Sequence, residues 1–320
     1  MYLNWIFLGT GIGLLVKGGA WLVDGAVNVS RKAGISELAI GLTVVALGTS
    51  APEFVVGIIG TISHNTELIL GNIIGSNIAN IFLVMGIAGV IRPIDIGSST
   101  IRKEIPFYLL ITLVLFGFLN ETWMDSSVSF GLNRWEAITF LVLLVAFIRY
   151  TFSLRRDHTK DLVSSDVKAL TPGWSAVYLL GGALTLGVGG ELTVRGAVAM
   201  AESFGISEAF IGLTVIAVGT SLPELVTSVQ AVRKGKFDIA VGNIIGSCVM
   251  NILFVLGLCG LLNHIPFVRF LNVDIAISIV GGLMLMMFMA TGKRHRLDRW
   301  EAVLFLVSYV VYLVYLVWRR

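Results

Sequence analysis

Long apolar stretches separated by short polar connections dominate the hydrophobic pattern of this chain. Ten of them approach or exceed the roughly 18 residues that a helix needs to cross a bilayer. They cover residues 3–30, 38–63, 68–90, 105–120, 136–154, 174–200, 209–232, 239–262, 273–291 and 300–318. None alternates apolar and polar positions as the strands of a membrane barrel do. The pattern therefore predicts an all-α integral membrane protein with ten transmembrane helices.

The second apolar stretch returns almost unchanged in the seventh. Residues 41–53 read GLTVVALGTSAPE and residues 212–224 read GLTVIAVGTSLPE, and the same spacing of 171 positions relates Asn80 to Asn251. Five predicted spans separate each motif from its copy, and an odd number of crossings reverses the direction through the membrane. Inverted repeats of this kind build midplane sites in many secondary transporters.

The repeat also predicts the domain organisation. We expect a first inverted repeat over residues 1–155, a short cytoplasmic linker over residues 156–172, and a second repeat over residues 173–320. A weaker echo supports five helices in each half, because Arg-Trp-Glu-Ala opens both the fifth and the tenth span.

Composition supports the membrane assignment and limits the function classes. The chain is 56% hydrophobic, with a mean hydropathy of +0.89, and only 13% of its residues are charged, against about 25% in soluble domains. Cys248 and Cys259 lie in one span, so neither a disulfide framework nor a cysteine metal site is expected. We expect the lipid bilayer as surroundings, no nucleic acid and no obligate protein partner.

Lysine and arginine gather in the odd-numbered connections. The even-numbered connections carry only Arg134 and Arg269, and Arg319 and Arg320 at the end of the chain are the exception to the pattern. The positive-inside rule therefore predicts a multi-pass protein of an inner or plasma membrane with both termini extracytoplasmic. No cleavable signal peptide is apparent.

One glutamate lies deep in each copy of the repeated motif, Glu53 in the first and Glu224 in the second. An unpaired charge at this depth costs at least about 2.5–3.5 kcal/mol, so a cation is the expected partner. The GTSxPE sequence also fits a capping box, in which Ser50 or Ser221 starts a helix and the glutamate closes the cap. We favour an ion ligand, because broken helices at membrane depth must be buried or line a wet cavity.

A second motif supplies neutral oxygens. GNIIGS at residues 71–76 and 242–247 is followed by Asn80 and Asn251, and Asn, Ser and Asn recur every four residues on one helix face. Carboxylates, amides, hydroxyls and freed carbonyls form an all-oxygen set that suits Ca²⁺ best, then Mg²⁺, and also Na⁺. Two carboxylates balance one Ca²⁺ or hold two or three Na⁺, and such exclusive occupancy with alternating access predicts exchange.

With these paired motifs the chain resembles the cation/calcium exchanger superfamily, and within it the sodium/calcium exchanger type of prokaryotes. The resemblance implies that Glu53 and Glu224 are central Ca²⁺ ligands, that carbonyls of Thr49 and Thr220 assist them, and that Asn80 and Asn251 lie at the centre. It implies two flanking Na⁺ sites, one from the Ala46 carbonyl, Ser50 and Ser76 with Glu53, the other from the Ala217 carbonyl, Ser221 and Ser247 with Glu224.

The resemblance also implies electrogenic exchange, commonly three Na⁺ for one Ca²⁺, with no enzymatic activity and no cofactor. Several relatives carry aspartate where this chain has Asn251, so we expect independence of K⁺. Gly-Ser in place of acidic residues after the GN pairs disfavours coupling to H⁺. The alternatives are an H⁺/Ca²⁺ or other cation exchanger, a passive cation channel, and, least supported, an intramembrane hydrolase.

The first span of each half is rich in glycine, which permits close helix packing. Static packing and a sliding gate are both compatible with this composition. Lys17 and Asp24 in the first of these spans, and Glu191 and Arg195 in the second, are expected to reach the membrane surface or to pair locally.

Overall fold

The computed structural model describes residues 2–62, 66–120, 131–154, 169–203, 217–290 and 295–319. The first half contains α1 (Tyr2–Ala33), α2 (Glu37–Ile40), the π-helix η1 (Gly41–Val45), α3 (Ala46–Thr49), α4 (Ala51–Ile62), α5 (Thr66–Ile78), η2 (Ala79–Val84), α6 (Met85–Ile91), η3 (Thr100–Glu104), α7 (Ile105–Leu119) and α8 (Arg134–Ser153). The second half contains α9 (Pro172–Ser203), α11 (Ala217–Thr220), α12 (Leu222–Arg233), α13 (Phe237–Met250), η7 (Asn251–Leu256), α14 (Gly257–Leu262), α15 (Leu271–Ala290) and α16 (Arg299–Trp318).

The helices follow the predicted apolar stretches, and the all-helical membrane fold is confirmed. Within the described ranges, seven helices are long and apolar enough to cross a membrane, and an eighth span is formed if the bent pair Glu37–Thr49 and Ala51–Ile62 is counted as one. α7, on the short fourth stretch, has 15 residues. The start of the seventh stretch and most of the predicted linker lie outside the described residues.

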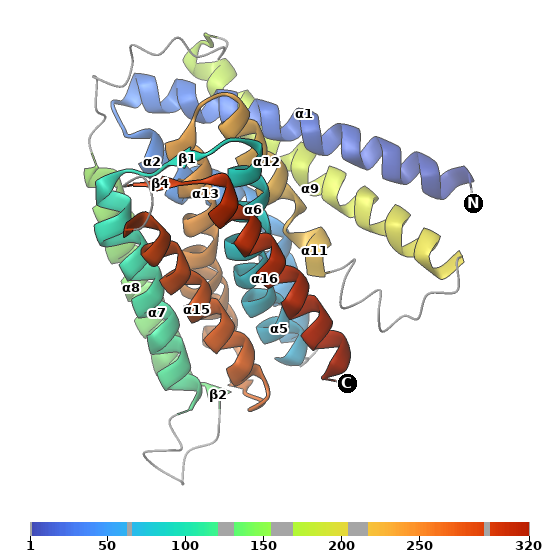
Figure 1. Cartoon of the computed structure of the whole chain (residues 1–320), viewed down its shortest axis with the longest axis vertical. Helices are drawn as coiled ribbons and strands as arrows, with labels where there is room; N and C mark the ends of the chain where they lie inside the picture. Colours follow the sequence, from blue (N-terminus) through green and yellow to red (C-terminus); the bar gives the residue numbers. More distant parts are fainter. Residues whose placement is uncertain are drawn as a thin grey trace.

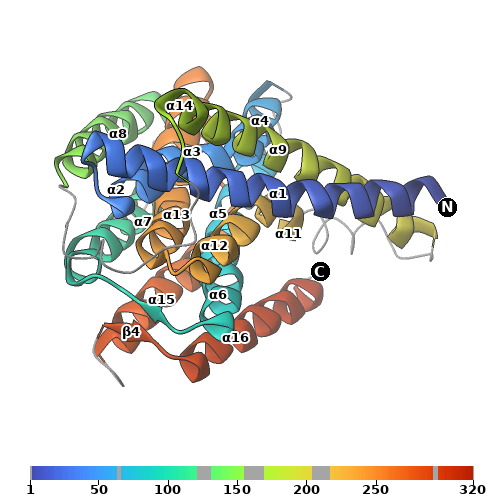
Figure 2. The same ribbon diagram turned by 90° about the horizontal axis from the view of Figure 1, so that it is seen from above.

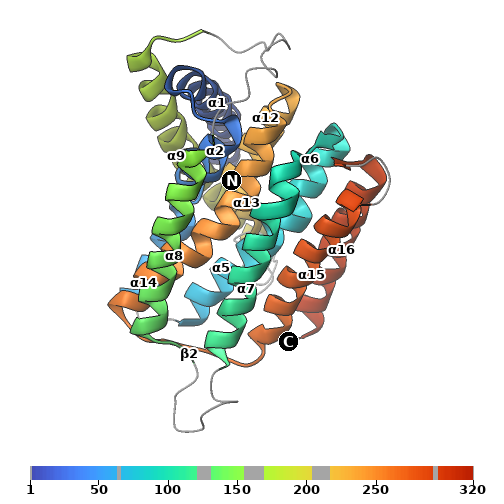
Figure 3. The same ribbon diagram turned by 90° about the vertical axis from the view of Figure 1, so that its left-hand side faces the viewer.

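The third and eighth spans form the centre of the molecule. In the described chain, α5 with α6 and α13 with α14 are the most buried of the candidate spans, and α5 and α13 run through the middle of the bundle (Figure 3). The peripheral helices α8 and α16 expose apolar side chains such as Val142 and Val311, as expected for surfaces that face lipid.

Two short β-ribbons join the halves at opposite ends of the bundle (Figure 1). β1 (Ile94–Asp95) pairs with β4 (Arg296–Leu297), and β2 (Gly131–Leu132) pairs with β3 (Ile265–Pro266), both antiparallel. In each ribbon the strand after the third span of one half meets the strand before the fifth span of the other. The helices repeat this exchange, because α6 packs against α16 and α8 against α14.

The Arg-Trp-Glu-Ala echo marks two capping boxes. Asn133 caps α8 with Glu136, and Asp298 caps α16 with Glu301. Each glutamate closes the box by accepting from the backbone N–H of its capping residue, which satisfies donors that would otherwise be orphaned. The fifth spans of both halves therefore begin in the same way.

α1 and α9 lie side by side and cross the other helices obliquely (Figures 1 and 2). Glycines make their close approach possible: a Cβ on Gly18 would lie 2.9 Å from the Leu186 nitrogen, and one on Gly182 would lie 2.7 Å from the Leu22 nitrogen. Real Cβ atoms do not approach so closely, so this face excludes larger residues.

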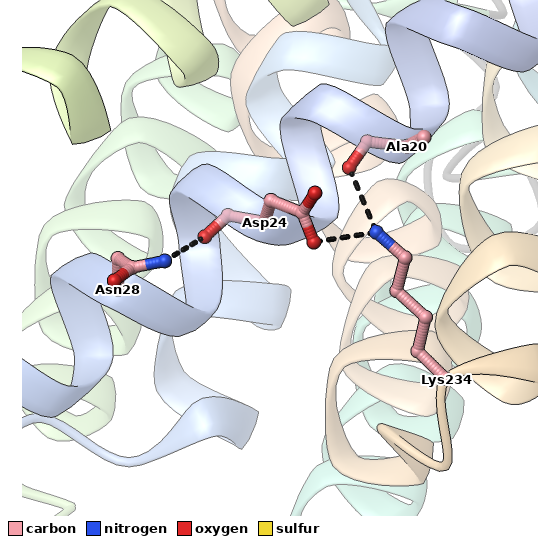
Figure 4. Close-up of polar contacts among 4 residues, drawn as sticks. All are labelled: Ala20, Asp24, Asn28 and Lys234. Carbon is pink, nitrogen blue, oxygen red and sulfur yellow. Dashed lines mark hydrogen bonds and ion pairs between the residues drawn. The ribbon is translucent and has the colours of Figure 1, made fainter. Parts of the chain in front are cut away.

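The charges on these two helices differ in their partners. Arg195 and Glu191 form the expected pair one turn apart, and Lys17 lies 5.1 Å from the Trp21 ring centre. The expectation of local pairing is wrong for Asp24, which forms an ion pair with Lys234 at the end of α12 (Figure 4). Lys234 also donates to the Ala20 carbonyl at 3.2 Å. This contact connects α1 to the second half of the chain. Its partner, Lys234, is 210 residues away from Asp24, so the residues near Asp24 in the sequence do not indicate the pair.

Candidate functional site

The two broken spans bring their glutamates into the interior. The chain bends by 50° between Glu37–Thr49 and Ala51–Ile62, and Ser221 separates α11 from α12 in the second half. Glu53 and Glu224 lie in the first turns of α4 and α12, and both are fully buried. The positive end of each half-helix dipole favours an anionic side chain at this position.

Serines from three spans hold the carboxylates. Ser76 Oγ donates to Glu53 Oε1 at 3.1 Å, and Ser247 Oγ, its repeat counterpart, donates to Glu224 Oε1 at 3.3 Å. Ser50 breaks the pattern by donating at 2.9 Å to Glu224 Oε1 of the opposite half. The breaks of both halves therefore meet in one cluster.

Several buried oxygens of this cluster have no hydrogen-bond partner among the described residues. They are Glu53 Oε2, Glu224 Oε2, Asn80 Oδ1, Asn251 Oδ1 and Ser221 Oγ. Leaving buried polar atoms unpaired costs about 1–3 kcal/mol each, and more for charged groups, so native proteins rarely do it without a functional reason. The orphaned atoms are carboxylate, amide and hydroxyl oxygens, the donor set that hard cations prefer.

Asparagines brace the broken backbone. Asn72 Nδ2 donates to the Glu53 carbonyl and Asn243 Nδ2 to the Glu224 carbonyl, each at 3.3 Å. Thr49 Oγ1 donates to Asn243 Oδ1 at 2.9 Å, which joins the break of the first half to α13 of the second. Asn72 and Asn243, the first asparagines of the two GNIIGS motifs, thus use their amino groups to fix the backbone of the glutamates.

The capping-box interpretation of GTSxPE is wrong for α12. Ser221 occupies the cap position, but its side chain makes no capping hydrogen bond. Glu224 Oε1 instead accepts from Ser50 and Ser247. The carboxylate is thus turned toward the other spans rather than back onto its own helix end.

The remaining predicted site residues belong to the broken spans and to the π-helices of the third and eighth spans. Thr220 Oγ1 lies 3.5 Å from Ser76 Oγ, and the Ala46 carbonyl accepts from Thr49 Oγ1 at 3.2 Å and from the Ser50 nitrogen at 2.9 Å. Ala217 is the first residue of α11. Asn80 and Asn251 lie in the π-helices η2 and η7, a distortion that is frequent at functional sites.

Sequence reasoning missed two side chains that contact residues of the cluster and a third, Thr227, that is buried one turn after Glu224 on α12. Asn77 contacts Asn251 from the opposite half, and Ser228 accepts from Asn243 at 3.0 Å. Thr227 is fully buried, and its hydroxyl has no partner in the described structure. The repeat itself held a signal, because residues 56 and 57, the counterparts of Thr227 and Ser228, are Val and Gly.

The cluster contains few of the side chains that usually ligate resident metal ions. Among the described residues, no group of three or more His, Cys, Asp or Glu side chains is placed to hold a metal ion. The site combines only two carboxylates with neutral oxygens, which distinguishes it from zinc and copper centres.

Inverted repeats, broken helices and a buried pair of carboxylates define a secondary transporter of cations. The family described as sodium/calcium exchanger protein matches residues 3–153 and 174–318. The chain belongs to this family, as the paired motifs predicted, and it is a cation/calcium exchanger rather than an enzyme.

Individual relatives match over nearly the full length. The chain is 31% identical to the sodium/calcium exchanger MaX1 of Methanosarcina acetivorans, covering 98% of both chains. It is 36% identical to the putative antiporter CaxA of Alkalimonas amylolytica, covering 96% of both, and 34% identical to the inner membrane protein YrbG of Escherichia coli, covering 99% of this chain and 98% of that protein. Solved structures of the sodium-calcium exchanger NCX_Mj superpose with a TM-score of 0.81 at 30% identity over 98% of both chains.

Proposed function

We propose that this chain is a Na⁺/Ca²⁺ antiporter that works by alternating access. The observation that carries the proposal is the buried hydrogen bond from Ser50, at the break of the first half, to Glu224, beside the break of the second half, because it joins the two broken spans. A single shared site explains exclusive occupancy, since one Ca²⁺ and several Na⁺ would compete for the same two charges. NCX_Mj, soaked with Na⁺ and Ca²⁺, supports this choice of ions.

Within this proposal Glu53 and Glu224 are the Ca²⁺ ligands. Their orphaned Oε2 atoms are free to bind a cation, while Oε1 of each is already held by serine. The carbonyls of Thr49 and Thr220 assist, and Asn80 and Asn251 contribute amide oxygens at the centre. Two negative charges match the charge of one Ca²⁺, so the bound state is neutral.

Two flanking Na⁺ sites complete the proposal. One uses Glu53, Ser50, Ser76 and the Ala46 carbonyl, and the other uses Glu224, Ser221, Ser247 and the Ala217 carbonyl. The Ser50 hydroxyl donates to Glu224 Oε1 and so links the first Na⁺ site to the carboxylate of the second half. The orphaned hydroxyl of Ser221 supports its role as a ligand.

Coupling and orientation follow from charge. Asn251 is neutral, so no additional carboxylate is present for K⁺, and exchange of three Na⁺ for one Ca²⁺ moves one net charge per cycle.

We place the protein in an inner or plasma membrane with both termini extracytoplasmic, because of the basic odd-numbered connections and because a relative is named as an inner membrane protein. The two repeats would be residues 1–155 and 173–320.

The experiment that tests this function is ⁴⁵Ca²⁺ uptake into proteoliposomes loaded with Na⁺. Uptake should need an outward Na⁺ gradient and should be unchanged when K⁺ is replaced by choline. It should rise when the interior is made positive and fall when the interior is made negative, since each cycle carries one net positive charge outward. Uptake without an opposing ion would indicate a channel. Uptake driven by a pH gradient alone would indicate an H⁺/Ca²⁺ exchanger.

A further inference from the structure

The side-chain amide of Asn251 takes part in a chain of hydrogen bonds that crosses between the halves. Asn77 Nδ2 donates to the backbone carbonyl of Cys248 at 3.3 Å. Asn251 Nδ2 donates to Asn77 Oδ1 at 3.0 Å. Asn77 is 2% exposed and Asn251 is fully buried, so bulk water does not compete for these contacts.

The chemistry of the groups allows only one orientation in this chain. A backbone carbonyl accepts and cannot donate, so the atom of Asn77 that faces Cys248 must be its amino group. The oxygen of Asn77 then faces Asn251, and only the amino group of Asn251 can donate to it. This leaves Asn251 Oδ1 on the other edge of the amide, buried and without a partner among the described residues.

The corresponding place in the other half is occupied by a different residue. The repeat spacing relates Asn77 to Cys248 and Asn80 to Asn251. Cys248 has a thiol, a weak hydrogen-bonding group, which lies 3.9 Å from the Asn77 carbonyl. Neither amide atom of Asn80 has a hydrogen-bond partner in the described structure. One central amide is therefore fixed by a second amide, and its repeat counterpart has no such amide partner in the described structure.

We propose that Asn77 is a positioning residue that acts through Asn251 and presents the Asn251 oxygen to the transported cation. The inference rests on the proposed function, in which Asn251 is a ligand. Because the oxygen is already turned away from Asn77, the cation binds without first reorienting that amide. Asn80 lacks this support, so the two halves contribute unequally to one central site.

The test is a double-mutant cycle on Na⁺-driven Ca²⁺ uptake with Asn77→Ala, Asn251→Ala and the double variant. Loss of one buried hydrogen bond of about 1 kcal/mol predicts that Asn77→Ala raises the KM for Ca²⁺ about 5-fold, with the maximal rate much less affected. In the Asn251→Ala background the same change should have almost no further effect on KM, because its target is gone. Equal effects of Asn77→Ala in both backgrounds would overturn the proposal.

A matched control separates this role from general damage. Asn120 is also a buried asparagine and forms a reciprocal amide pair with Asn272, at 2.8 and 3.0 Å, in a different part of the bundle. Asn120→Ala should leave the KM for Ca²⁺ unchanged. If Asn77→Ala does not fold, Asn77→Ser replaces it, since a hydroxyl is too short to bridge Cys248 and Asn251, and the same cycle applies.

Failure of the positioning role is distinguishable from failure of the exchange function. Na⁺-dependent uptake that Glu53→Gln abolishes, together with an unchanged KM in Asn77→Ala, would remove the positioning role and leave the exchanger intact. Absence of Na⁺-dependent uptake in the unmodified protein would remove both.

Discussion

At the scale of single residues, the two glutamates differ from ordinary buried carboxylates because one oxygen of each lacks a hydrogen-bond partner in the described structure. Each uses Oε1 for serine hydroxyls, while Oε2 has no partner among the described residues. No arginine or lysine is paired with either in the described ion pairs. A cation bound between them would supply the missing interaction for both, which makes the pair interdependent.

We predict that Glu53→Gln and Glu224→Gln each abolish Ca²⁺ uptake. Removing one carboxylate leaves a bound Ca²⁺ with one uncompensated positive charge. Removing one partner of a buried charge pair costs about 3–5 kcal/mol, or roughly 100-fold or more in affinity. Uptake in proteoliposomes measures this, with thermal melting in detergent as the control for folding. Full exchange in either folded variant would contradict the assignment.

A second prediction uses the unequal roles of the two serines at the breaks. Ser50 donates to Glu224, whereas the Ser221 hydroxyl has no partner in the described chain. A hydrogen bond to a charged group contributes about 1.5–3 kcal/mol, so Ser50→Ala should raise the KM for Ca²⁺ about 10-fold or more. Ser221→Ala should change mainly the dependence on Na⁺. If both variants change the KM for Ca²⁺ and the Na⁺ dependence to the same extent, the hydrogen bond from Ser50 to Glu224 does not contribute to Ca²⁺ binding.

At the scale of elements, the close pair α1 and α9 differs from the rest of the bundle. It packs through glycine backbones rather than through large side chains, and α1 in addition contacts α12. A larger side chain is therefore excluded at glycines that contact the partner helix and is tolerated at glycines with nothing within 4 Å. Whether the pair also slides as a gate stays a prediction.

Adjacent glycines on α9 give a matched test of this packing. A Cβ at Gly182 would lie 2.7 Å from the Leu22 nitrogen, whereas at Gly181 nothing lies within 4 Å. Gly182→Ala should destabilise the protein by about 1–3 kcal/mol through overpacking, while Gly181→Ala should be neutral or slightly stabilising, since alanine favours helix. The melting temperatures of the two variants in detergent measure the difference, and identical values would contradict the close approach.

The repeat was the main source of the predicted site residues. The strict spacing pointed to Glu53, Glu224, Asn80 and Asn251, because each has a counterpart in a motif of its own. It could not reveal that Ser50 donates to the opposite half, because a repeat shows which residues correspond and not which ones meet. The contact of Asn77 with Asn251 was missed for the same reason.

At the scale of the whole molecule, the two halves are related in sequence but not identical in contacts. Asp24 of α1 pairs with Lys234 of α12 (Figure 4), and these side chains are only 15% and 17% exposed. The counterparts of these residues in the repeat are Arg195 and Ser63, which cannot form an equivalent ion pair. The ion pair therefore has no counterpart between the repeat-related residues, and it connects α1 to α12, the helix that carries Glu224.

We predict that Asp24→Asn and Lys234→Gln each destabilise the protein by about 1.5–3 kcal/mol, the usual contribution of a hydrogen bond to a charged group. The exchanged pair Asp24→Lys with Lys234→Asp should recover most of this loss. The exposed pair of Glu191 and Arg195 provides the control, since Glu191→Gln should cost at most about 1 kcal/mol. Similar melting temperatures for Asp24→Asn and Glu191→Gln would argue against the connection.

The central claim is that one buried site, built from both halves, binds either Ca²⁺ or Na⁺. Equilibrium ⁴⁵Ca²⁺ binding to the purified protein, with Na⁺ as competitor, tests it most directly. The account predicts one Ca²⁺ per chain, displacement by Na⁺ with a Hill coefficient above one, and loss of binding in both Glu53→Gln and Glu224→Gln. Ca²⁺ binding that persists in saturating Na⁺, or that survives in either glutamine variant, would contradict it.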